Sequence, residues 1–257
     1  MILPMLTAQR KELLLSRLAT ERRIVAKTLA QELGTSEDTI RRDLRELAHV
    51  GLLQRVHGGA LPVSPAVGSL AVRAQVSSEE KVQLGRYAAS LIQKGQVVIL
   101  DGGTTAVQVA RHLPPNLHAT VVTHSPNVAV ELAAHPEIEI LMLGGRLFRH
   151  SMVNVGCALL EGLAHLRADL YFMGVTGVHP EVGFSTGDGE EAAVKRALHA
   201  HSAETVVLAS AEKLLAASPF VIGPLSGVAS LVVSYDTSES TLRALQDGGA
   251  TVRTAWA

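Results

Sequence analysis

The stretch from Val97 to Arg111, VVILDGGTTAVQVAR, restricts the possible folds more than any other part of the chain. It begins with four apolar, mostly β-branched residues, which are typical of a buried strand. The residues from Thr105 to His112 have the pattern of a helix, and only Asp101 to Thr104 separate the two elements. The sequence therefore predicts a glycine-rich turn at the carboxyl end of a strand.

The residues of this turn are suited to holding an anion. Gly102 and Gly103 allow a sharp turn and a close approach of the backbone, while Thr104 and Thr105 place hydroxyls beside the unpaired N–H groups of a helix start. In open α/β sheets, ligands bind outside the carboxyl ends of the strands. We expect a phosphate group to bind here; the alternative is a tight turn, capped by threonine, that holds no ligand.

Strands and helices alternate through the rest of this region, which predicts a parallel sheet with helices on both faces. A helix is expected to start at a capping box formed by Ser77 and Glu80 and to end near Gly95. Further strands are expected at 120–123, 139–143, 170–175, 205–209, 231–234 and 251–254, with helices at 127–134, 158–166, 190–201 and 240–246.

The composition is consistent with a large aliphatic core. Of the 257 residues, 47% are hydrophobic and only 3% are aromatic, which suits helices packed on a parallel sheet. The single cysteine, Cys157, excludes an intrachain disulfide and indicates a reducing, cytoplasmic location. The sequence has neither the pattern of a signal peptide nor an apolar run of about 18 residues, so we expect neither secretion nor a membrane span.

The first 60 residues have a different pattern, with three short helices predicted over 7–19, 27–33 and 35–49. Thr7 is the expected cap of the first helix, and Leu14, Leu15 and Leu18 form its apolar side. The second helix lacks a side-chain acceptor at its start. The buried stripe predicted for the third helix consists of Ile40, Leu44 and Leu47.

The opposite face of the third helix is basic and rich in hydroxyls. It carries Ser36, Thr39, Arg41, Arg42 and Arg45. Arginines beside small hydroxyl residues near a helix start, after a helix and a tight turn, match the recognition helix of a helix-turn-helix domain. The alternative is a solvated arginine face held by ion pairs of Asp38 with Arg42 and of Arg42 with Glu46.

A predicted hairpin with a Gly-Gly turn follows this helix and completes a winged helix-turn-helix domain. Arg55 and His57 on this wing are expected to lie near a nucleic-acid backbone, although an isolated histidine in a turn is commonly an exposed bystander. The first 60 residues carry 10 Lys and Arg against 7 Asp and Glu, whereas the remainder carries 13 against 17. A basic head on an acidic body fits double-stranded DNA as partner of the head.

Two runs in this part resemble a known family. TIRRDLREL (39–47) and GLLQRVHGGA (51–60) are similar to the amino-terminal domain of the DeoR family of bacterial transcriptional regulators. The resemblance extends into the body through DGGTT, LGG (143–145), GVTGV (174–178), EEAAVKRAL (190–198) and Lys213. It implies operator binding by the third helix and an effector domain similar in fold to ribose-5-phosphate isomerase.

The resemblance also implies a phosphorylated sugar or polyol as effector and a set of residues that bind it. The implied residues are Asp101, Gly103, Thr104, Thr105, Thr123, Ser125, Glu191, Lys195 and Lys213. From the residues alone, we add candidates that follow predicted strands: Gly102, His124, Gly144 and Gly145. The chain departs from the family pattern at His124, where asparagine is common, and at Ser210, where aspartate is common.

The sequence thus predicts an α/β protein with a winged helix-turn-helix domain over 1–61, a linker over 62–76 and an effector domain over 77–257. We expect a ligand-responsive homo-oligomeric repressor that is not an enzyme and needs neither cofactor nor metal. The alternative is a sugar-phosphate isomerase with an accessory head, in which Glu191 acts as base beside Lys195 or Lys213. For Glu191 and Lys195, four residues apart, a surface ion pair is a further alternative.

Overall fold

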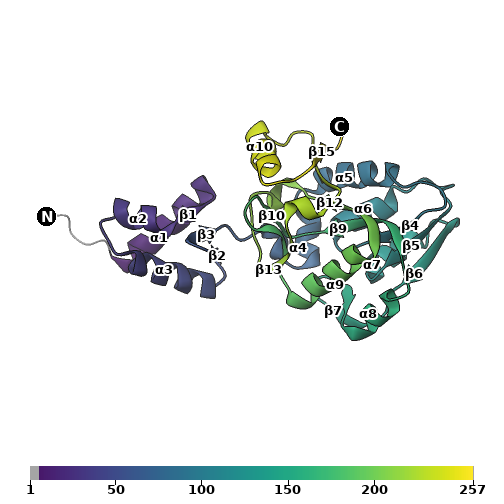
Figure 1. Cartoon of the computed structure of the whole chain (residues 1–257), viewed down its shortest axis with the longest axis horizontal. Helices are drawn as coiled ribbons and strands as arrows, with labels where there is room; N and C mark the ends of the chain where they lie inside the picture. Colours follow the sequence, from purple (N-terminus) through teal and green to yellow (C-terminus); the bar gives the residue numbers. More distant parts are fainter. Residues whose placement is uncertain (1–5, 257) are drawn as a thin grey trace.

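The computed structural model describes residues 6–256, so residues 1–5 and 257 of the expected domains lie outside the described residues. A small amino-terminal domain lies at one end of the long axis and a larger α/β domain at the other, with the chain passing between them after β3 (Figure 1). No helix among the described residues has the length and apolar character needed to cross a membrane.

The amino-terminal domain is a three-helix unit with a small antiparallel sheet. Its elements are α1 (Thr7–Glu21), β1 (Ile24–Val25), α2 (Ala26–Glu32), α3 (Glu37–His49), β2 (Gln54–Val56) and β3 (Gly59–Leu61). The strands lie in the order β1-β3-β2. The apolar sides of the three helices pack into one core that contains the predicted Leu14, Ile40 and Leu44. The winged helix-turn-helix expected from the sequence is therefore present.

Two local predictions in this domain are wrong. Thr7 is the first residue of α1 rather than its cap, and Leu6 at the cap position makes no side-chain hydrogen bond. The wing turns at His57 and Gly58, because Gly59 already pairs with Val56 in the hairpin. Gly59 is needed for a close approach instead: a Cβ on it would lie 1.7 Å from the carbonyl oxygen of Ile24.

The segment between the domains is folded onto the α/β domain. It contains the short 3-10 turn η1 (Pro65–Val67) and the helix α4 (Leu70–Gln75). Val63 forms an isolated bridge with Ala217, and the carbonyl of His150 accepts a hydrogen bond from the N–H of Leu70. The strand β3 ends at Leu61, before the proline-containing residues, and these residues find partners on the body.

The α/β domain is built on a parallel sheet of seven strands in the order β15-β14-β12-β9-β4-β5-β6. These strands are β4 (Val97–Leu100), β5 (Ala119–Thr123), β6 (Ile138–Met142), β9 (Ala168–Gly174), β12 (Ser202–Leu208), β14 (Ser230–Val233) and β15 (Val252–Thr254). The first strand of the domain, β4, lies near the middle between β9 and β5. The parallel sheet predicted from the alternation is confirmed.

Helices cover both faces of this sheet. One face packs against α5 (Ser78–Ser90), α6 (Thr104–Arg111) and α7 (Pro126–Leu132). The other packs against α8 (Cys157–Leu163), α9 (Gly189–Ala200) and α10 (Glu239–Asp247). Alternate residues of β4 enter the two cores, Val98 and Leu100 on one side and Ile99 on the other, as the two-residue period of a strand requires.

Short antiparallel strands were not predicted. They are β7 (Arg146–Phe148), β8 (Val153–Val155), β10 (Gly177–His179), β11 (Gly183–Thr186) and β13 (Phe220–Gly223). The predicted capping box is also absent: Ser77 makes no capping hydrogen bond, and the Glu80 carboxylate accepts from the N–H of Ala211 instead. The helix that follows ends at Ser90, before the expected Gly95.

Candidate functional site

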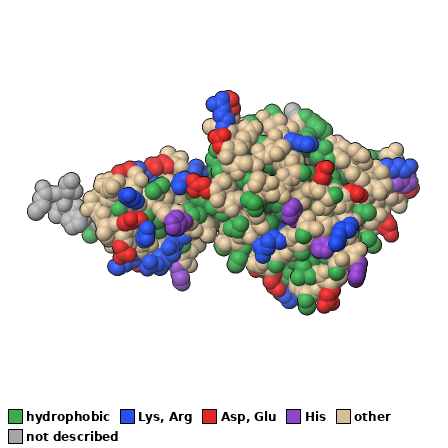
Figure 2. Space-filling model, viewed as in Figure 1, with side chains coloured by type: hydrophobic (Ala, Val, Ile, Leu, Met, Phe, Trp, Pro, Cys, Tyr) green, Lys and Arg blue, Asp and Glu red, His purple; other side chains and the backbone are tan. Residues whose placement is uncertain are grey.

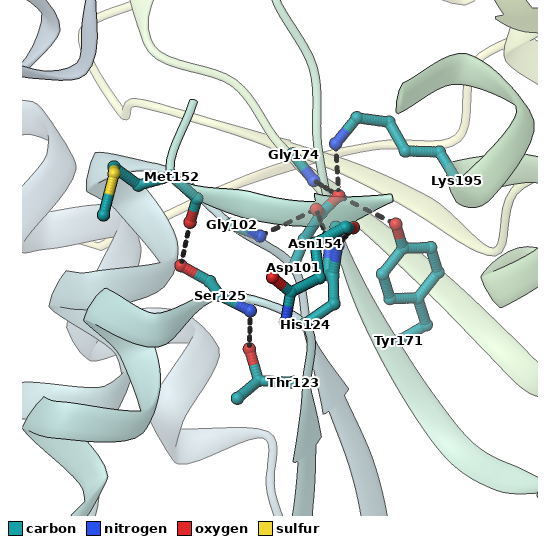
Figure 3. A network of polar contacts seen from close by, with 10 residues as sticks. All are labelled: Asp101, Gly102, Thr123, His124, Ser125, Met152, Asn154, Tyr171, Gly174 and Lys195. Carbon is teal, nitrogen blue, oxygen red and sulfur yellow. Dashed lines mark hydrogen bonds and ion pairs between the residues drawn. The ribbon is translucent and has the colours of Figure 1, made fainter. Parts of the chain in front are cut away.

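The carboxyl ends of β4, β5, β9 and β12 meet at one edge of the sheet, because these four strands are neighbours and parallel. Asp101 follows β4, His124 follows β5 and Gly174 ends β9. Figure 3 shows these residues pointing toward one another, together with Tyr171 and the side chain of Lys195 from α9. The predicted convergence of polar strand ends is therefore observed.

The carboxylate of Asp101 is the centre of this network and is fully buried. Its Oδ1 atom accepts from the backbone N–H of Gly102 at 2.7 Å and contacts Nε2 of His124 at 2.9 Å. Its Oδ2 atom accepts from the Tyr171 hydroxyl at 2.7 Å, the Gly174 N–H at 2.8 Å and the Lys195 ammonium at 2.6 Å. Five protein groups thus occupy this carboxylate, which ties three strands and one helix together.

The electrostatics of this network keep Asp101 ionised. Burial alone raises the pKa of this carboxyl, but the nearby Lys195 ammonium and the hydrogen-bonded His124 outweigh burial and hold the pKa well below its usual range. The same burial, together with the Asp101 charge, raises the pKa of the Tyr171 hydroxyl well above its usual value. Tyr171 therefore acts as a hydrogen-bond donor to a permanent anion.

A cavity lies directly above this network, over the Asp101–Thr104 turn and the start of α6. Its lining includes the predicted Gly102, Gly103, Thr104, Thr105, Glu191, Lys195 and Lys213. Asp101, Thr123, His124 and Ser125 are each buried and lie outside this lining. Gly144 and Gly145 are exposed between β6 and β7 and are also absent from it. The structure thus brings seven of the predicted residues to one cavity.

The lysines of the cavity differ in their partners. Lys195 pairs with Asp101, so the predicted surface pair of Glu191 with Lys195 is wrong; both side chains are buried. Lys81 donates to the carbonyl of Arg73 at 2.8 Å and pairs with Glu212 at 3.1 Å. Lys213 forms no salt bridge among the described residues, and burial lowers its pKa to about 8.

Three residues that line the cavity have buried polar atoms without a hydrogen-bond partner among the described residues. These atoms are Nε and Nη2 of Arg73, Oγ1 of Thr105 and Oε2 of Glu212. An unsatisfied polar group in a protein interior costs about 1–3 kcal/mol, so such groups require an explanation. Unpartnered donors and an acceptor on residues of one cavity are explained by a polar ligand that binds there.

Arg73, Lys81 and Glu212 were missed at the sequence level. Lys81 gave the clearest signal, because it lies on the buried side of α5 with Leu84 and Ala88, at positions three and seven residues before them. Glu212 lies two residues after Ser210, whose hydroxyl donates to Oε1 of Glu212 at 2.8 Å. A carboxylate is therefore present beside the position where the family pattern has aspartate.

The second candidate surface is the exposed side of α3 with the wing. Ser36 caps α3 by accepting from the N–H of Thr39 at 3.1 Å. The side chains of Arg41, Arg42, Arg45, Arg55 and His57 are exposed. Figure 2 shows Lys and Arg side chains gathered along the edge of the small domain that α3 occupies in Figure 1.

Ion pairs on α3 differ in part from the expected ones. Arg41 pairs with Glu37 at 2.7 Å, and Arg42 lies 3.8 Å from Asp38. The predicted pair of Arg42 with Glu46 is not formed, because Glu46 binds Lys11 of α1. These pairs are exposed, and such pairs contribute little to stability, so phosphate groups compete with them readily.

Comparison with known proteins assigns both domains. Residues 10–66 match the DeoR-like helix-turn-helix domain, and residues 76–235 match the DeoR C terminal sensor domain. The chain belongs to the DeoR family. This DeoR-family regulator is 35% identical over 217 residues to the HTH-type transcriptional regulator GlpR of Haloferax volcanii. The aligned residues make up 82% of this chain and 83% of the relative.

Other relatives of this DeoR-family chain have similar lengths. It is 34% identical to the HTH-type transcriptional repressor GlcR of Bacillus subtilis, over 82% of this chain and 81% of the relative. Among solved structures, ribose 5 phosphate isomerase A from Neisseria gonorrhoeae is 15% identical, with a TM-score of 0.41 over 54% of each chain. The named relatives among sequences are transcriptional regulators or repressors.

Proposed function

We propose that this DeoR-family regulator is a repressor of carbohydrate or polyol metabolism genes that senses a phosphorylated sugar or polyol in the cavity over the Asp101–Thr104 turn. The observation that carries the proposal is the buried cation Lys213 in the same cavity as the hydroxyl of Thr105 at the start of α6. Within residues 6–256, Lys213 forms no salt bridge and the Thr105 hydroxyl has no hydrogen-bond partner. Cations, a helix start and a glycine turn together suit a phosphate.

The predicted residues divide into two layers in this proposal. Gly102, Gly103, Thr104, Thr105, Glu191 and Lys213 contact the effector, whereas Asp101, Thr123, His124 and Ser125 hold the turn in place from below. Gly144 and Gly145 have no part in it. Lys195 has both functions, because it lines the cavity and pairs with Asp101.

Operator binding is assigned to α3 and the wing. In a homo-oligomer, two copies of α3 enter successive major grooves about 34–36 Å apart or at a multiple of this distance. The DNA-contacting residues of the third helix lie on α3 or at its start: Ser36, Thr39, Arg41, Arg42 and Arg45. Arg55 and His57 contact the sugar-phosphate backbone of the DNA from the wing. An effector then favours one arrangement of the two domains, typically by about 1–3 kcal/mol of coupling.

Two measurements test the proposal. A thermal-shift screen with ribose 5-phosphate, glucose 6-phosphate and glycerol 3-phosphate identifies a ligand by a raised unfolding midpoint, since a ligand of the folded state stabilises it. The same mixtures, assayed for isomerised product, test the enzyme alternative. A screen without any shift contradicts the effector part of the proposal, and turnover that Glu191→Gln abolishes supports the enzyme.

Arg42 provides the test on the DNA side. A duplex is first selected by the wild-type protein from a randomised library. Arg42→Ala is expected to weaken binding by about 1–3 kcal/mol and to relax selectivity at one base pair if this arginine reads a base. Arg86→Ala, an exposed arginine on α5, is the matched control. Equal titrations of wild type and Arg42→Ala remove Arg42 from the recognition set.

A further inference from the structure

Arg73 is the residue whose environment the described contacts explain least. It lies on α4, in the segment between the domains, and its side chain reaches the cavity, where Nη1 lies 3.9 Å from the position that a Cβ would occupy on Gly103. The Nε and Nη2 atoms are buried and have no hydrogen-bond partner among the described residues. Burial lowers the pKa of this guanidinium, against the attraction of Glu191 and Asp101.

The two unpartnered atoms are the pair that suits an oxyanion. Nε and Nη2 form one edge of the planar guanidinium, and this edge donates two parallel hydrogen bonds to two oxygens of a carboxylate or phosphate. Asp101 is not available for this role, because five other protein groups occupy its carboxylate. Glu191, the other carboxylate that attracts this guanidinium, forms no hydrogen bond with the edge either. The edge therefore fits an anion that comes from outside the protein.

The charge of the cavity also favours an anion. Four cationic side chains line it, Arg73, Lys81, Lys195 and Lys213, against the two carboxylates Glu191 and Glu212. The buried Asp101 beneath the lining pairs with Lys195, so an excess of one positive charge remains. A phosphate monoester, which carries about −1.5 to −2 at neutral pH, is attracted to this excess.

The position of Arg73 in the chain links the anion to the DNA-binding domain. Lys81 of α5 holds α4 by donating to the carbonyls of Arg73 and Val76. At the other end, Leu70 bonds to His150, and His150 lies 2.8 Å from the carbonyl of Val67 in η1. From η1, only a few residues lead back to β3 of the wing. A contact at Arg73 therefore acts on the segment that carries the head.

We propose that Arg73 binds the phosphate group of the effector through its Nε–Nη2 edge, and that α4 transmits this contact to the DNA-binding domain. This inference rests on the proposed function and extends it: the same anion that fills the cavity fixes α4 against the Asp101–Thr104 turn. Lys213 also lines the cavity, but it lies in the 3-10 turn η2 (Ala211–Lys213) of the body and not on α4, so its contact with the anion does not hold α4.

The test uses the full chain and inorganic phosphate as the probe, at ionic strength matched with chloride. Wild type is expected to show a raised unfolding midpoint and slower hydrogen–deuterium exchange in residues 70–76. Arg73→Met is expected to weaken phosphate binding at least tenfold and to lose this protection, while its midpoint without phosphate stays equal or rises. A purely structural arginine would instead lower that midpoint when replaced.

Two further variants separate binding from transmission. Lys213→Met is expected to weaken phosphate binding, yet to keep full protection of residues 70–76 at saturating phosphate. Arg86→Met on α5 is the control for loss of one exposed arginine and is expected to behave as wild type.

Failure of the inference and failure of the proposed function give different results. If wild type binds phosphate and Arg73→Met binds it equally, or if residues 70–76 gain no protection in wild type, Arg73 lacks the assigned role. If wild type responds neither to phosphate nor to the three phosphorylated compounds, the proposed effector class itself is wrong.

Discussion

Asp101 has no exposed surface, yet its charge is needed because Lys195 is buried against it. Asp101→Asn removes the anion and leaves a buried ammonium without a counter-charge, which costs about 3–5 kcal/mol in comparable buried pairs. Because the pKa of Asp101 is held low, its contribution is present above pH ~4 and is lost as the pH falls further. Trp256, the single tryptophan, reports unfolding of this domain by fluorescence in urea.

The control for this substitution is Asp247→Asn, which removes an exposed carboxylate from α10. We expect its unfolding midpoint to match that of wild type. A loss below about 1 kcal/mol in Asp101→Asn would show that Lys195 finds another partner and that the network does not depend on the charge.

Lys213 gives the cavity a pH dependence. Burial lowers its pKa to about 8, so the ammonium form that attracts an anion is lost between pH 7 and pH 9. Phosphate affinity is expected to fall about tenfold over this range, since a pKa near 8 leaves about one tenth of the lysine protonated at pH 9. The stability of the ligand-free protein changes in the opposite direction to the phosphate affinity. Between pH 8 and about 10.4 Lys213 is protonated in the unfolded chain and neutral in the folded one, so the free energy of unfolding rises with pH there.

Isothermal titration with phosphate at pH 7, 8 and 9 measures this dependence. Inorganic phosphate itself gains negative charge at the lower end of this range, because its second ionisation lies above the value of about 6 of a phosphate monoester. The contribution of Lys213 is therefore the difference between the wild-type profile and that of Lys213→Gln. Lys213→Gln is expected to bind more weakly at pH 7 and to flatten the profile. A profile that remains equally steep in Lys213→Gln assigns the titration to another group.

At the scale of elements, Gly59 holds the small sheet of the DNA-binding domain together. Any side chain there meets the backbone of β1, because a Cβ would lie 1.7 Å from the carbonyl oxygen of Ile24. Gly59→Ala is expected to separate β1 from β3, to lower the thermal midpoint of the head and to abolish DNA binding, while Trp256 still reports an intact body. Gly58→Asn is the control, because open space surrounds Gly58 and asparagine tolerates its positive φ.

The elements that the sequence predicts best are those determined by local pattern. The strand at 97–100 and the stripe of α3 both follow from the spacing of apolar residues, and both are confirmed. The antiparallel strands β7 and β13 are three and four residues long, which is too short to show a local period. The partner of β13, β11, is also distant in sequence, whereas β7 pairs with the nearby β8. The contribution of Arg73 to the cavity depends on how α4 folds back over α6, which no single stretch encodes.

The same limit applies to the site: contacts between residues that are distant in sequence leave no local pattern. The Asp101–Thr104 turn was predicted because one strand, one turn and one helix suffice to place it. Asp101 itself was predicted to face a ligand, whereas the structure directs it toward Tyr171, Gly174 and Lys195. Which way a carboxylate points depends on donors from strands more than 70 residues away, as for the N–H of Gly174. The residue types at strand ends therefore predict which edge of the sheet holds the site. They do not predict which side chains face the cavity and which lie buried beneath it.

At the scale of the whole molecule, the two domains are joined at Leu61 and Pro62, because the chain contacts the body from Val63 onward. The pair of Arg23 with Glu181 at 2.6 Å is an exposed link between them and contributes little energy. Insertion of Gly-Ser-Gly between Leu61 and Pro62 is therefore expected to leave both binding activities intact. It is expected to remove their coupling, because a flexible spacer does not transmit a displacement of α4 to the wing.

The measurement is a titration of the selected duplex with and without saturating phosphorylated ligand from the screen. In wild type, about 1–3 kcal/mol of coupling changes the DNA affinity about 5- to 150-fold, and reciprocity requires DNA to change the ligand affinity by the same factor. The same insertion after Pro115, in an exposed loop of the body, is the control and is expected to keep this ratio. A ratio that survives the insertion at Pro62 places the communication between subunits of an oligomer, outside the covalent connection of one chain.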